Sequence, residues 1–470
     1  FQNFLILSNR HIVSTAPPHS FKFFSVPARR RPFKRHGYPK VPTPIFSRMY
    51  AIMDYLFSGG RSPMKKCLFL CLSLLLAPVL ALCEPRAVLF TATDLHYIAP
   101  TLTDNGALFT DLIEQGDGKA MAYSDALIEA FVAQVIAEKP DALILSGDLT
   151  FNGARESHEA LSLRLARVRD AGIPVFVLPG NHDLNSSSAA RFEGDGYTRV
   201  DGVTAGEFAA LYHAFGFDGA LSRDADSLSY VAALSDDLRL LMLDVNTSAA
   251  PNAVLKGTLS WARRQLMQAQ ADGCRVIAVS HQNLIDHSGL LSSGFTIRNA
   301  DALRRLYAVS PVLCNLSGHI HLQHMGQTDS GLWDIATSSL AVSPNQYGVL
   351  TLTADALTYR TAPVRVSDWA AAQGLSDPNL LDFAAYSADF FRACCLRQAL
   401  AAIAGDDAPE QLADFFAEAN AAYFAGRMDT LARDSALEKR WQAQSGFLPL
   451  YLADILSQPP VNQCELTLSL

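Results

Sequence analysis

A short apolar run ends at residues 178–183 in Leu-Pro-Gly-Asn-His-Asp, and its last three side chains can all take part in chemistry. Asn181 offers a carbonyl oxygen, His182 an imidazole that titrates near neutral pH, and Asp183 a carboxylate able to hold that imidazole. Alone, the tetrapeptide Gly-Asn-His-Asp at 180–183 is most often an ordinary turn. This one follows a predicted buried strand at 173–178, and α/β proteins keep their sites where parallel strands end.

Four other predicted strands, which begin near residues 87, 142, 275 and 311, also run into loops that open with Asp, Asn or His. A single residue of this kind at a strand end is usually a cap or a turn former. Five strand ends that supply eight such residues indicate a shared site instead. These residues are Asp94, His96, Asp148, Asn181, His182, His281, His319 and His321.

The spacing of these residues suits a pair of metal ions. Asp94 and His96 are separated by one residue, as are His319 and His321, so each pair can face one side of an extended segment. Two such pairs, a shared carboxylate and two single ligands suit two divalent ions, which together can clamp a phosphoryl group. Because the donors are carboxylate, amide and imidazole, they favour Mn, Fe or Zn over copper or thiolate-bound zinc.

The same residues form five motifs in order along the chain, namely Asp-x-His, Gly-Asp, Gly-Asn-His-Asp, His and Gly-His-x-His. This arrangement resembles the calcineurin-like metallophosphoesterase superfamily over residues 88–364. The resemblance implies that His182 contacts the scissile phosphate and that Asp183 orients His182. It also implies two metal ions, one bound by Asp94, His96 and His321, the other by Asn181, His281 and His319, with Asp148 as the bridge.

Two longer stretches narrow the resemblance. Residues 145–158 and 281–287 resemble extracytoplasmic class III cyclic nucleotide phosphodiesterase-like proteins of Gram-positive bacteria. One departure is Phe151, which stands where many relatives carry an acidic residue. The implied activity is hydrolysis of a small phosphodiester, for which a cyclic nucleotide is one candidate, by a metal-activated hydroxide with His182 assisting.

Other functions use the same ligand residues. A phosphomonoesterase, a nucleotidase or a sphingomyelinase-like phosphodiesterase would have the same metal ligands, since loops select the substrate. A non-catalytic binding module on the same scaffold is an alternative of another class. His182 and Asp183 argue against a binding module, because such a scaffold needs neither side chain.

The pattern of apolar segments predicts how these residues are positioned. It predicts that strands alternate with helices at 124–138, 157–171 and 259–271. This order predicts an α/β fold over residues 84–366, and the resemblance implies that it is the metallophosphoesterase β-sandwich flanked by helices. Residues 367–470 are alanine-rich with helical spacing, which predicts a small C-terminal helical domain.

Charge is distributed unevenly along the 470 residues. Residues 1–66 carry 12 Lys and Arg against one acid, a net charge of +11, so the total of −8 leaves −19 for residues 67–470. An acidic body argues against binding of extended nucleic acid, which needs Lys and Arg to neutralise phosphates. We expect a small phosphodiester substrate and no protein partner.

The segment 64–83 has the form of a secretory signal, in which two lysines precede a short apolar run with small residues near Ala81. It predicts an extracytoplasmic protein. Residues 80–83, Leu-Ala-Leu-Cys, also resemble a lipobox, which would make Cys83 a lipid anchor to the membrane. Cleavage near Ala81 to give a soluble secreted protein fits equally well. Residues 1–63 are predicted to be a leader or a mistranslated upstream segment without an assigned function.

Overall fold

The apolar strands of the chain pair into two sheets, which the computed structural model describes within residues 86–403 and 405–470. The predicted signal segment at 64–83 and residues 1–63 lie outside the described residues. The strands of the first sheet, in spatial order, are β17 (Glu465–Ser469), β16 (Ala356–Pro363), β15 (Gln346–Leu352), β1 (Ala87–Ala92), β2 (Ala142–Leu145) and β3 (Val175–Val177). Strands β1, β2 and β3 are parallel, and β15 runs antiparallel to β1.

The second sheet has four parallel strands at its centre. Its strands, in spatial order, are β13 (His324–Gln327), β14 (Trp333–Ala336), β12 (Val312–Ser317), β11 (Arg275–Ser280), β8 (Leu238–Leu243), β7 (Tyr230–Ala233) and β6 (Ser222–Arg223). The run from β14 to β8 is parallel throughout. Two short ribbons lie outside both sheets, β4 (Ala190–Glu193) with β5 (Gly196–Arg199) and β9 (Asn246–Thr247) with β10 (Ala250–Pro251).

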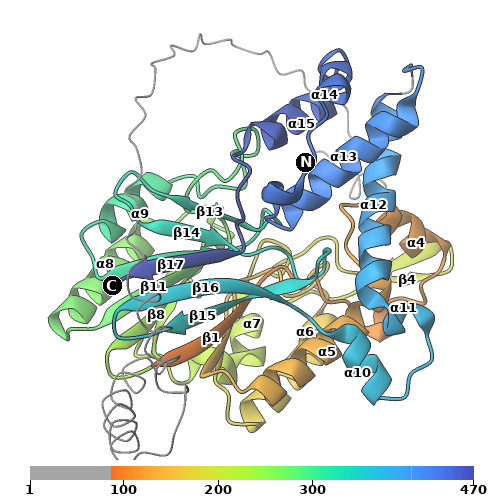
Figure 1. Cartoon of the computed structure of the whole chain (residues 1–470). Helices are drawn as coiled ribbons and strands as arrows, with labels where there is room; N and C mark the ends of the chain where they lie inside the picture. The colour runs from red at the N-terminus through yellow and green to blue at the C-terminus, as the bar shows by residue number, and fades with distance from the viewer. Residues whose placement is uncertain (1–85, 404) are drawn as a thin grey trace, which may run out of the picture. The chain divides into compact units, whose positions relative to one another are not determined.

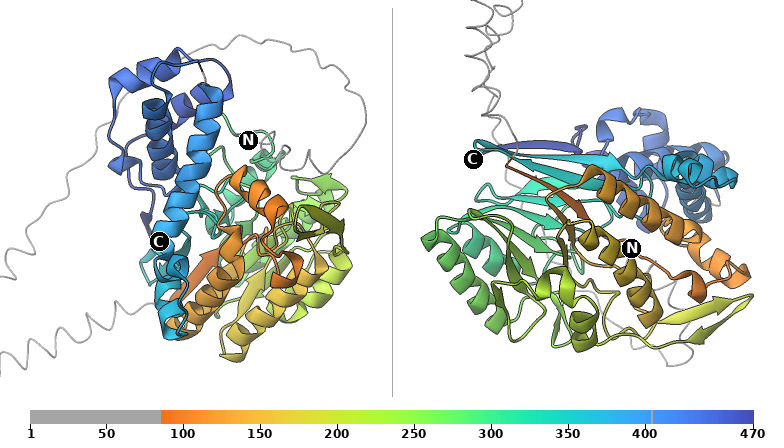
Figure 2. Two further views of the ribbon diagram at one scale, coloured as in Figure 1. Left: turned by 90° about the vertical axis from the view of Figure 1, so that its right-hand side faces the viewer. Right: turned by 90° about the horizontal axis from the view of Figure 1, so that it is seen from below.

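The two sheets form two layers with helices around them (Figure 2). Phe90 of the first sheet and Ile277 of the second belong to one apolar core, which also takes in residues of α5 (Ser124–Glu138) and α6 (Arg155–Asp170). A separate apolar cluster packs Trp261 of α8 (Lys256–Ala271) on the second sheet. The α/β sandwich flanked by helices that the sequence predicts is therefore confirmed.

Most predicted elements appear close to their predicted bounds. Helix α5 spans the predicted 124–138, whereas β3 is shorter than the predicted 173–178. Pro174 has no N–H to donate to a neighbouring strand, which accounts for the late start of β3. The other helical segments before residue 366 are Pro100–Leu102, α4 (Ala107–Glu114), Met121–Tyr123, α7 (Ala205–Leu211), His213–Phe217 and α9 (Ala300–Tyr307).

Residues from Val366 onward are mainly helical, as the sequence predicts. The apolar stripe of α13 (Pro409–Phe424) is buried in the core of this region. Among the described residues, no helix is long and apolar enough to cross a membrane. The helices are α10 (Val366–Ala372), α11 (Pro378–Leu381), α12 (Phe383–Ala402), α13 (Pro409–Phe424), Met428–Thr430, α14 (Ser435–Gln442) and α15 (Phe447–Ser457).

Strand β17 departs from this helical pattern. It pairs antiparallel with β16, from Ala356 opposite Ser469 to Arg360 opposite Glu465, and forms the outer strand of the first sheet (Figure 1). The segment has only five residues, of which three are exposed, so its alternating pattern is too short to predict a strand. The chain therefore returns to the first sheet after the helices.

Candidate metal centre

The first predicted ligand group comes together in the structure. Asp94 and His96 follow β1 and His321 follows β12, yet their donor atoms lie within 4.8 Å of one another. His96 Nε2 is 3.1 Å from His321 Nε2, and Asp94 Oδ1 is 3.2 Å from His321 Nε2. All three residues are buried. Two ring nitrogens and a carboxylate oxygen thus converge on one point, as the ligands of a single cation do.

The second group forms around Asp148, which follows β2. Asp148 Oδ2 lies 3.3 Å from His281 Nε2, and that same nitrogen lies 3.1 Å from Asn181 Oδ1. Donor atoms of Asp148, His281 and His319 lie within 4.8 Å of one another. Asp148 Oδ2 is also 4.0 Å from His96 Nε2 of the first group. This oxygen therefore stands between the two groups, at the position that a bridging ligand would take.

Asp94 and Asp148 each use one carboxylate oxygen to accept hydrogen bonds from the surrounding chain, and each presents the other oxygen to the cluster. Asp94 Oδ2 accepts hydrogen bonds from Thr93 Oγ1 at 2.7 Å and from the backbone N–H of His319 at 2.8 Å. Asp148 Oδ1 accepts from the backbone N–H of His182 at 2.8 Å. These bonds fix the direction of the remaining oxygen of each carboxylate, as outer partners do in preorganised metal sites.

Three of the histidines have one ring nitrogen beside an oxygen that can only accept a hydrogen bond. That nitrogen must carry the N–H, so the opposite nitrogen of the neutral ring remains an electron-pair donor. Metal-binding histidines in proteins are oriented in this way. The pairs are His281 Nδ1 with Ser146 O (3.0 Å), His319 Nε2 with Gly294 O (3.0 Å) and His321 Nδ1 with Asp117 Oδ2 (2.9 Å).

The backbone at the ligand pairs is not extended, so the expected reason for their convergence is wrong. Asp94 and His96 have φ values of 51° and 45°, and His319 and His321 have φ values of 67° and 63°. All four lie in the left-handed region, which costs a residue with a side chain about 1–2 kcal/mol. The pairs face the cluster because the chain turns at each ligand, and the packed surroundings must hold those turns.

Two glycines beside the ligands allow backbone segments to approach closely. A Cβ atom on Gly180 would collide with Asp148, and one on Gly318 would collide with Thr93 and Asp94. Any side chain at either position would displace a predicted ligand. The glycines of the Gly-Asn-His-Asp and Gly-His-x-His motifs thus serve close packing.

His182 lies at the cluster but is more exposed than the buried ligands His96, His281 and His321. Its side chain is 24% exposed, and its Nε2 is 3.8 Å from Asp148 Oδ2. The carbonyl oxygen of Phe151 lies 3.1 Å from His182 Nδ1 and so sets the orientation of the ring. Nε2 of His182 also lies close enough to His96 and Asp148 for the three residues to share a cation.

The expected role of Asp183 in orienting His182 is wrong. Asp183 Oδ2 accepts hydrogen bonds from the backbone N–H groups of Leu149 (3.0 Å) and Gly180 (2.8 Å). Its Oδ1 accepts from the backbone N–H and the hydroxyl of Thr150, both at 3.0 Å. Asp183 therefore holds the loop after β2 against the turn after β3. Adjacency in the sequence suggested a contact with His182, but the turn directs the two side chains apart.

Sequence reasoning missed Asp117 and Lys119. Lys119 Nζ is 2.8 Å from both carboxylate oxygens of Asp117, which in turn contacts the ligand His321. The two residues lie in the stretch Gln-Gly-Asp-Gly-Lys at 115–119, whose composition is that of an ordinary surface turn. Only their burial in the structure distinguishes the pair.

The charges of the cluster are strongly coupled. Burial raises the pKa of Asp148, but His281, His182 and His96 outweigh it and hold that pKa well below its usual range. Burial lowers the pKa of His281, yet the Asp148 carboxylate outweighs it and raises the pKa to about 9. For His319, burial together with His281 lowers the pKa to about 3. Asp148 therefore stays ionised and attracts positive charge, from an imidazolium or from a cation.

These observations fit a pair of divalent cations. The donor atoms are nitrogens and oxygens, the set that suits Mn, Fe and Zn. The ring nitrogens that do not face the cluster in His281, His319 and His321 already have partners, and one oxygen of each carboxylate is left for the cluster. The groups are therefore ready to bind cations without rearrangement of their surroundings.

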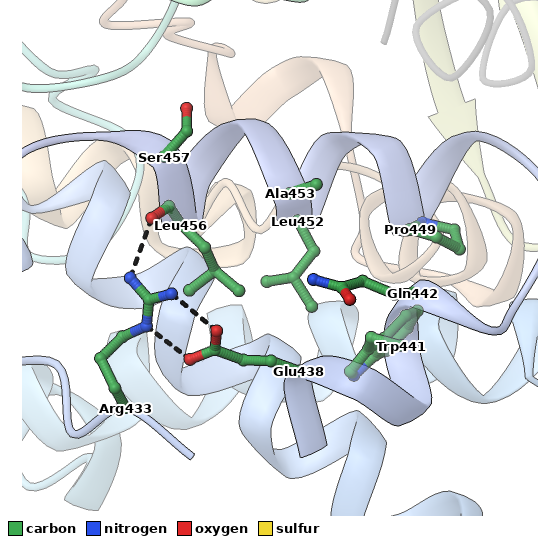
Figure 3. Close-up of a pocket in the computed structure, with 9 residues that line it drawn as sticks. All are labelled: Arg433, Glu438, Trp441, Gln442, Pro449, Leu452, Ala453, Leu456 and Ser457. Carbon is green, nitrogen blue, oxygen red and sulfur yellow. Dashed lines mark hydrogen bonds and ion pairs between the residues drawn. The ribbon is translucent and has the colours of Figure 1, made fainter. Parts of the chain in front are cut away.

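A pocket of about 220 Å³ lies apart from this cluster, at α14 and α15 of the C-terminal region (Figure 3). Arg433 contacts Glu438 with two nitrogens, at 2.5 Å and 2.7 Å, and donates to the carbonyl oxygen of Leu456 at 2.8 Å. These bonds join the two helices across the pocket. Its lining contains none of the predicted ligands, so we assign it no part in the chemistry.

Two regions of the chain match known family models. Residues 91–323 match the model described as calcineurin-like phosphoesterase. Residues 365–459 match the model described as the C-terminal domain of cyclic nucleotide phosphodiesterase. A comparison with curated proteins found no match.

Several solved structures are similar to this chain. A dimetal phosphatase from Danio rerio is 14% identical with a TM-score of 0.44, and the alignment covers 59% of this chain and 96% of that chain. A purple acid phosphatase from yellow lupin (Lupinus luteus) seeds is 13% identical, with a TM-score of 0.38 and coverage of 59% and 51%. The sulfate thiohydrolase SoxB of Thermus thermophilus, in complex with glycerol, is 14% identical, with a TM-score of 0.33 and coverage of 67% and 61%.

The matched phosphoesterase region spans all five motif loops, whose side chains form the groups described above. The chain is a metal-dependent phosphoester hydrolase. It carries a calcineurin-like phosphoesterase domain, whose family uses a dinuclear metal centre, followed by a region that matches the C-terminal domain of cyclic nucleotide phosphodiesterase. The resemblance seen in the sequence motifs is thereby confirmed.

Proposed function

We propose that this chain is a secreted phosphodiesterase that hydrolyses a small phosphodiester, with cyclic nucleotides as the first candidate class. The observation that carries the proposal is the position of Asp148 Oδ2 between the two ligand groups, with His182 facing it from the exposed side. The match of residues 365–459 to a cyclic nucleotide phosphodiesterase domain supports a phosphodiester as the substrate.

The proposed centre holds two divalent ions of Mn, Fe or Zn. When bound, such a pair clamps phosphoryl oxygens, activates the attacking water and stabilises charge in an in-line displacement. The residues proposed to hold the ions are Asp94, His96 and His321 for one, Asn181, His281 and His319 for the other, and Asp148 for both.

The proposed role of His182 is to assist the leaving group. The Phe151 carbonyl takes the N–H of His182 Nδ1, so the ring presents Nε2 to the cluster. In its imidazolium form the ring also carries a proton on Nε2, which it can give to the leaving oxygen as a general acid, and it is then left neutral with its N–H on Nδ1. The partial exposure of His182 suits a residue that meets a substrate arriving from solvent.

A second pocket, of about 580 Å³, also has none of the proposed ligands in its lining and is linked to the centre only through Gly294. It includes Gly294, whose carbonyl oxygen lies beside His319, and the exposed Arg298. Asn252 Nδ2 donates to the carbonyl oxygens of Gly294 and Thr296 and so fixes this wall.

The test of the proposal uses two chromogenic esters and metal removal. With added Mn, the purified protein should hydrolyse bis-p-nitrophenyl phosphate faster than p-nitrophenyl phosphate. Prolonged chelation should abolish this activity, and Mn should restore it, because the ions supply the attacking water. Turnover of 3′,5′-cyclic nucleotides then identifies the substrate class.

Each other function has its own outcome in this assay. Faster hydrolysis of the monoester would replace the proposal with a phosphomonoesterase or nucleotidase. Selective hydrolysis of a phosphocholine diester would indicate a sphingomyelinase-like enzyme. Bound metal without turnover of any ester would indicate a binding module.

The proposed secretion depends on segment 64–83, with Cys83 as a candidate lipid anchor. A chain expressed from Met64 should be cut near Ala81 and should reach the outside of the cytoplasmic membrane. Mass spectrometry of the mature amino terminus distinguishes a lipidated Cys83 from a free end. An amino terminus that still contains Lys65 and Lys66 would rule out both forms of export.

A further inference from the structure

Two charged residues outside the ligand set reach the metal centre from the loop after α4. Asp117 Oδ2 lies 2.9 Å from His321 Nδ1, and Lys119 Nζ lies 2.8 Å from each oxygen of Asp117. The side chains of His321, Asp117 and Lys119 are only 5%, 15% and 8% exposed. Buried charges are costly unless they are paired, so each of these groups depends on its neighbour.

The contact with Asp117 determines which ring nitrogen of His321 faces the cluster. A carboxylate only accepts hydrogen bonds, so the proton of the neutral ring sits on Nδ1. Nε2 then remains an electron-pair donor and points to Asp94 Oδ1 at 3.2 Å. Such an outer carboxylate raises the basicity of a metal-binding imidazole and fixes its direction.

The loop that carries Asp117 is in turn held by helix α12 of the C-terminal region (Figure 1). Gly118 has a φ of 85° and packs so closely on Phe391 that an added Cβ would lie 2.5 Å from its ring. Gln398 Nε2 donates to the carbonyl oxygen of Gly116 at 2.9 Å. Helix α12 therefore fixes the residues on both sides of Asp117.

The chain that leaves His321 is fixed by the same region. The backbone N–H of Gln323 donates to the carbonyl oxygen of Phe424 at 3.0 Å. The side-chain amide of Gln323 donates to the carbonyl oxygen of Gln463 at 2.9 Å. Leu322 is buried in the apolar cluster of the C-terminal helices. The C-terminal region thus supports this ligand from two sides, through the loop that carries Asp117 and through the residues that follow His321.

We propose that Asp117 and Lys119 are positioning residues for the metal ligand His321, and that α12 fixes the loop that carries them. The C-terminal helical region is in this view a built-in part of the metal centre, although it supplies none of the proposed ligands. The inference rests on the proposed ligand set and concerns how one of its members is held.

The test measures the affinity of the full-length protein for Mn by competition with a chelator. Asp117→Asn should weaken the binding of one ion by about 10–100-fold and leave the other nearly unchanged, as loss of an outer carboxylate does in other metal sites. The unpaired Lys119 ammonium should contribute to this loss, because it repels the cation. Adding Lys119→Met to Asp117→Asn should therefore recover part of the affinity, which a purely structural role would not produce.

Matched variants test the part played by α12. Phe391 and Phe416 are both buried in the same apolar cluster, but it is Phe391 that packs on Gly118. Phe391→Ala should weaken binding of the same ion, whereas Phe416→Ala should not. Arg397→Gln breaks the 2.7 Å ion pair between α12 and Glu114 and should leave Mn affinity unchanged.

Circular dichroism and unfolding of the metal-free variants serve to show that they are folded. If Asp117→Asn does not fold, the double variant and Phe391→Ala decide the question. Wild-type affinity for both ions in Asp117→Asn and Phe391→Ala would overturn the inference and leave the proposed function intact. A wild-type protein that binds no divalent ion would instead overturn the proposed function, and the inference with it.

Discussion

Replacement of Asp148 by Ala should disturb both metal ions and reduce hydrolysis to background. Asp148 is the one residue proposed to bind both ions, and its Oδ2 lies 3.3 Å from His281 Nε2 and 4.0 Å from His96 Nε2. Its other oxygen holds the backbone N–H of His182. Alanine therefore removes the shared ligand and also releases the turn that carries His182.

Elemental analysis and turnover of bis-p-nitrophenyl phosphate measure this effect. Asp141→Ala is a suitable control, because Asp141 precedes β2 at the end opposite to Asp148 and its carboxylate accepts a hydrogen bond from the backbone N–H of Val88 on a neighbouring strand, at 2.6 Å. The control should keep both ions and most of its activity. Two bound ions and wild-type turnover in Asp148→Ala would show that the assignment of the bridge is wrong.

Replacement of His182 by Ala should separate chemistry from metal binding. If His182 assists the leaving group, the variant should keep both ions while kcat falls by about 10²–10⁴-fold, the usual contribution of general acid–base catalysis. KM should change less, since an interaction made mainly in the transition state is lost from kcat and kcat/KM together. Loss of one ion would instead make His182 a ligand and end its proposed role.

The leaving group provides an internal control for His182→Ala. Nitrophenolate leaves without much help, so the loss of rate should be smaller with nitrophenyl esters than with nucleotides. Asp183→Asn should behave differently, because Asp183 binds backbone N–H groups and does not orient His182. A buried amide would leave part of these donors without an acceptor, at about 1–3 kcal/mol in the free energy of unfolding.

Long apolar segments made most of the fold predictable from the sequence. Helix α5 and strand β11 appear where their periodicity placed them, because each buries a continuous apolar surface. Helix α4 and strand β17 were not predicted. Both are short, and β17 is largely exposed, so its position depends on pairing with β16 rather than on a pattern of its own.

The composition of the ligand groups was also predictable, but their local geometry was not. Residues such as Asp148 and His281 follow buried strands, and the carboxyl ends of parallel strands meet at one edge of a sheet. The left-handed backbone at Asp94 could not be predicted, because tertiary packing imposes it. Nor could Asp117, since its contact with His321 joins residues 204 positions apart in the chain.

Because of strand β17, the C-terminal helical region is attached to the first sheet at both of its ends. The chain leaves the first sheet at the end of β16 and returns to pair with β16 itself. A region attached through one linker could swing away while the sheet stays folded. Here the helices cannot separate from the sheet unless the ladder from Ala356 to Arg360 is first broken. The helices and the sheet should therefore gain and lose their structure together, as a single cooperative unit.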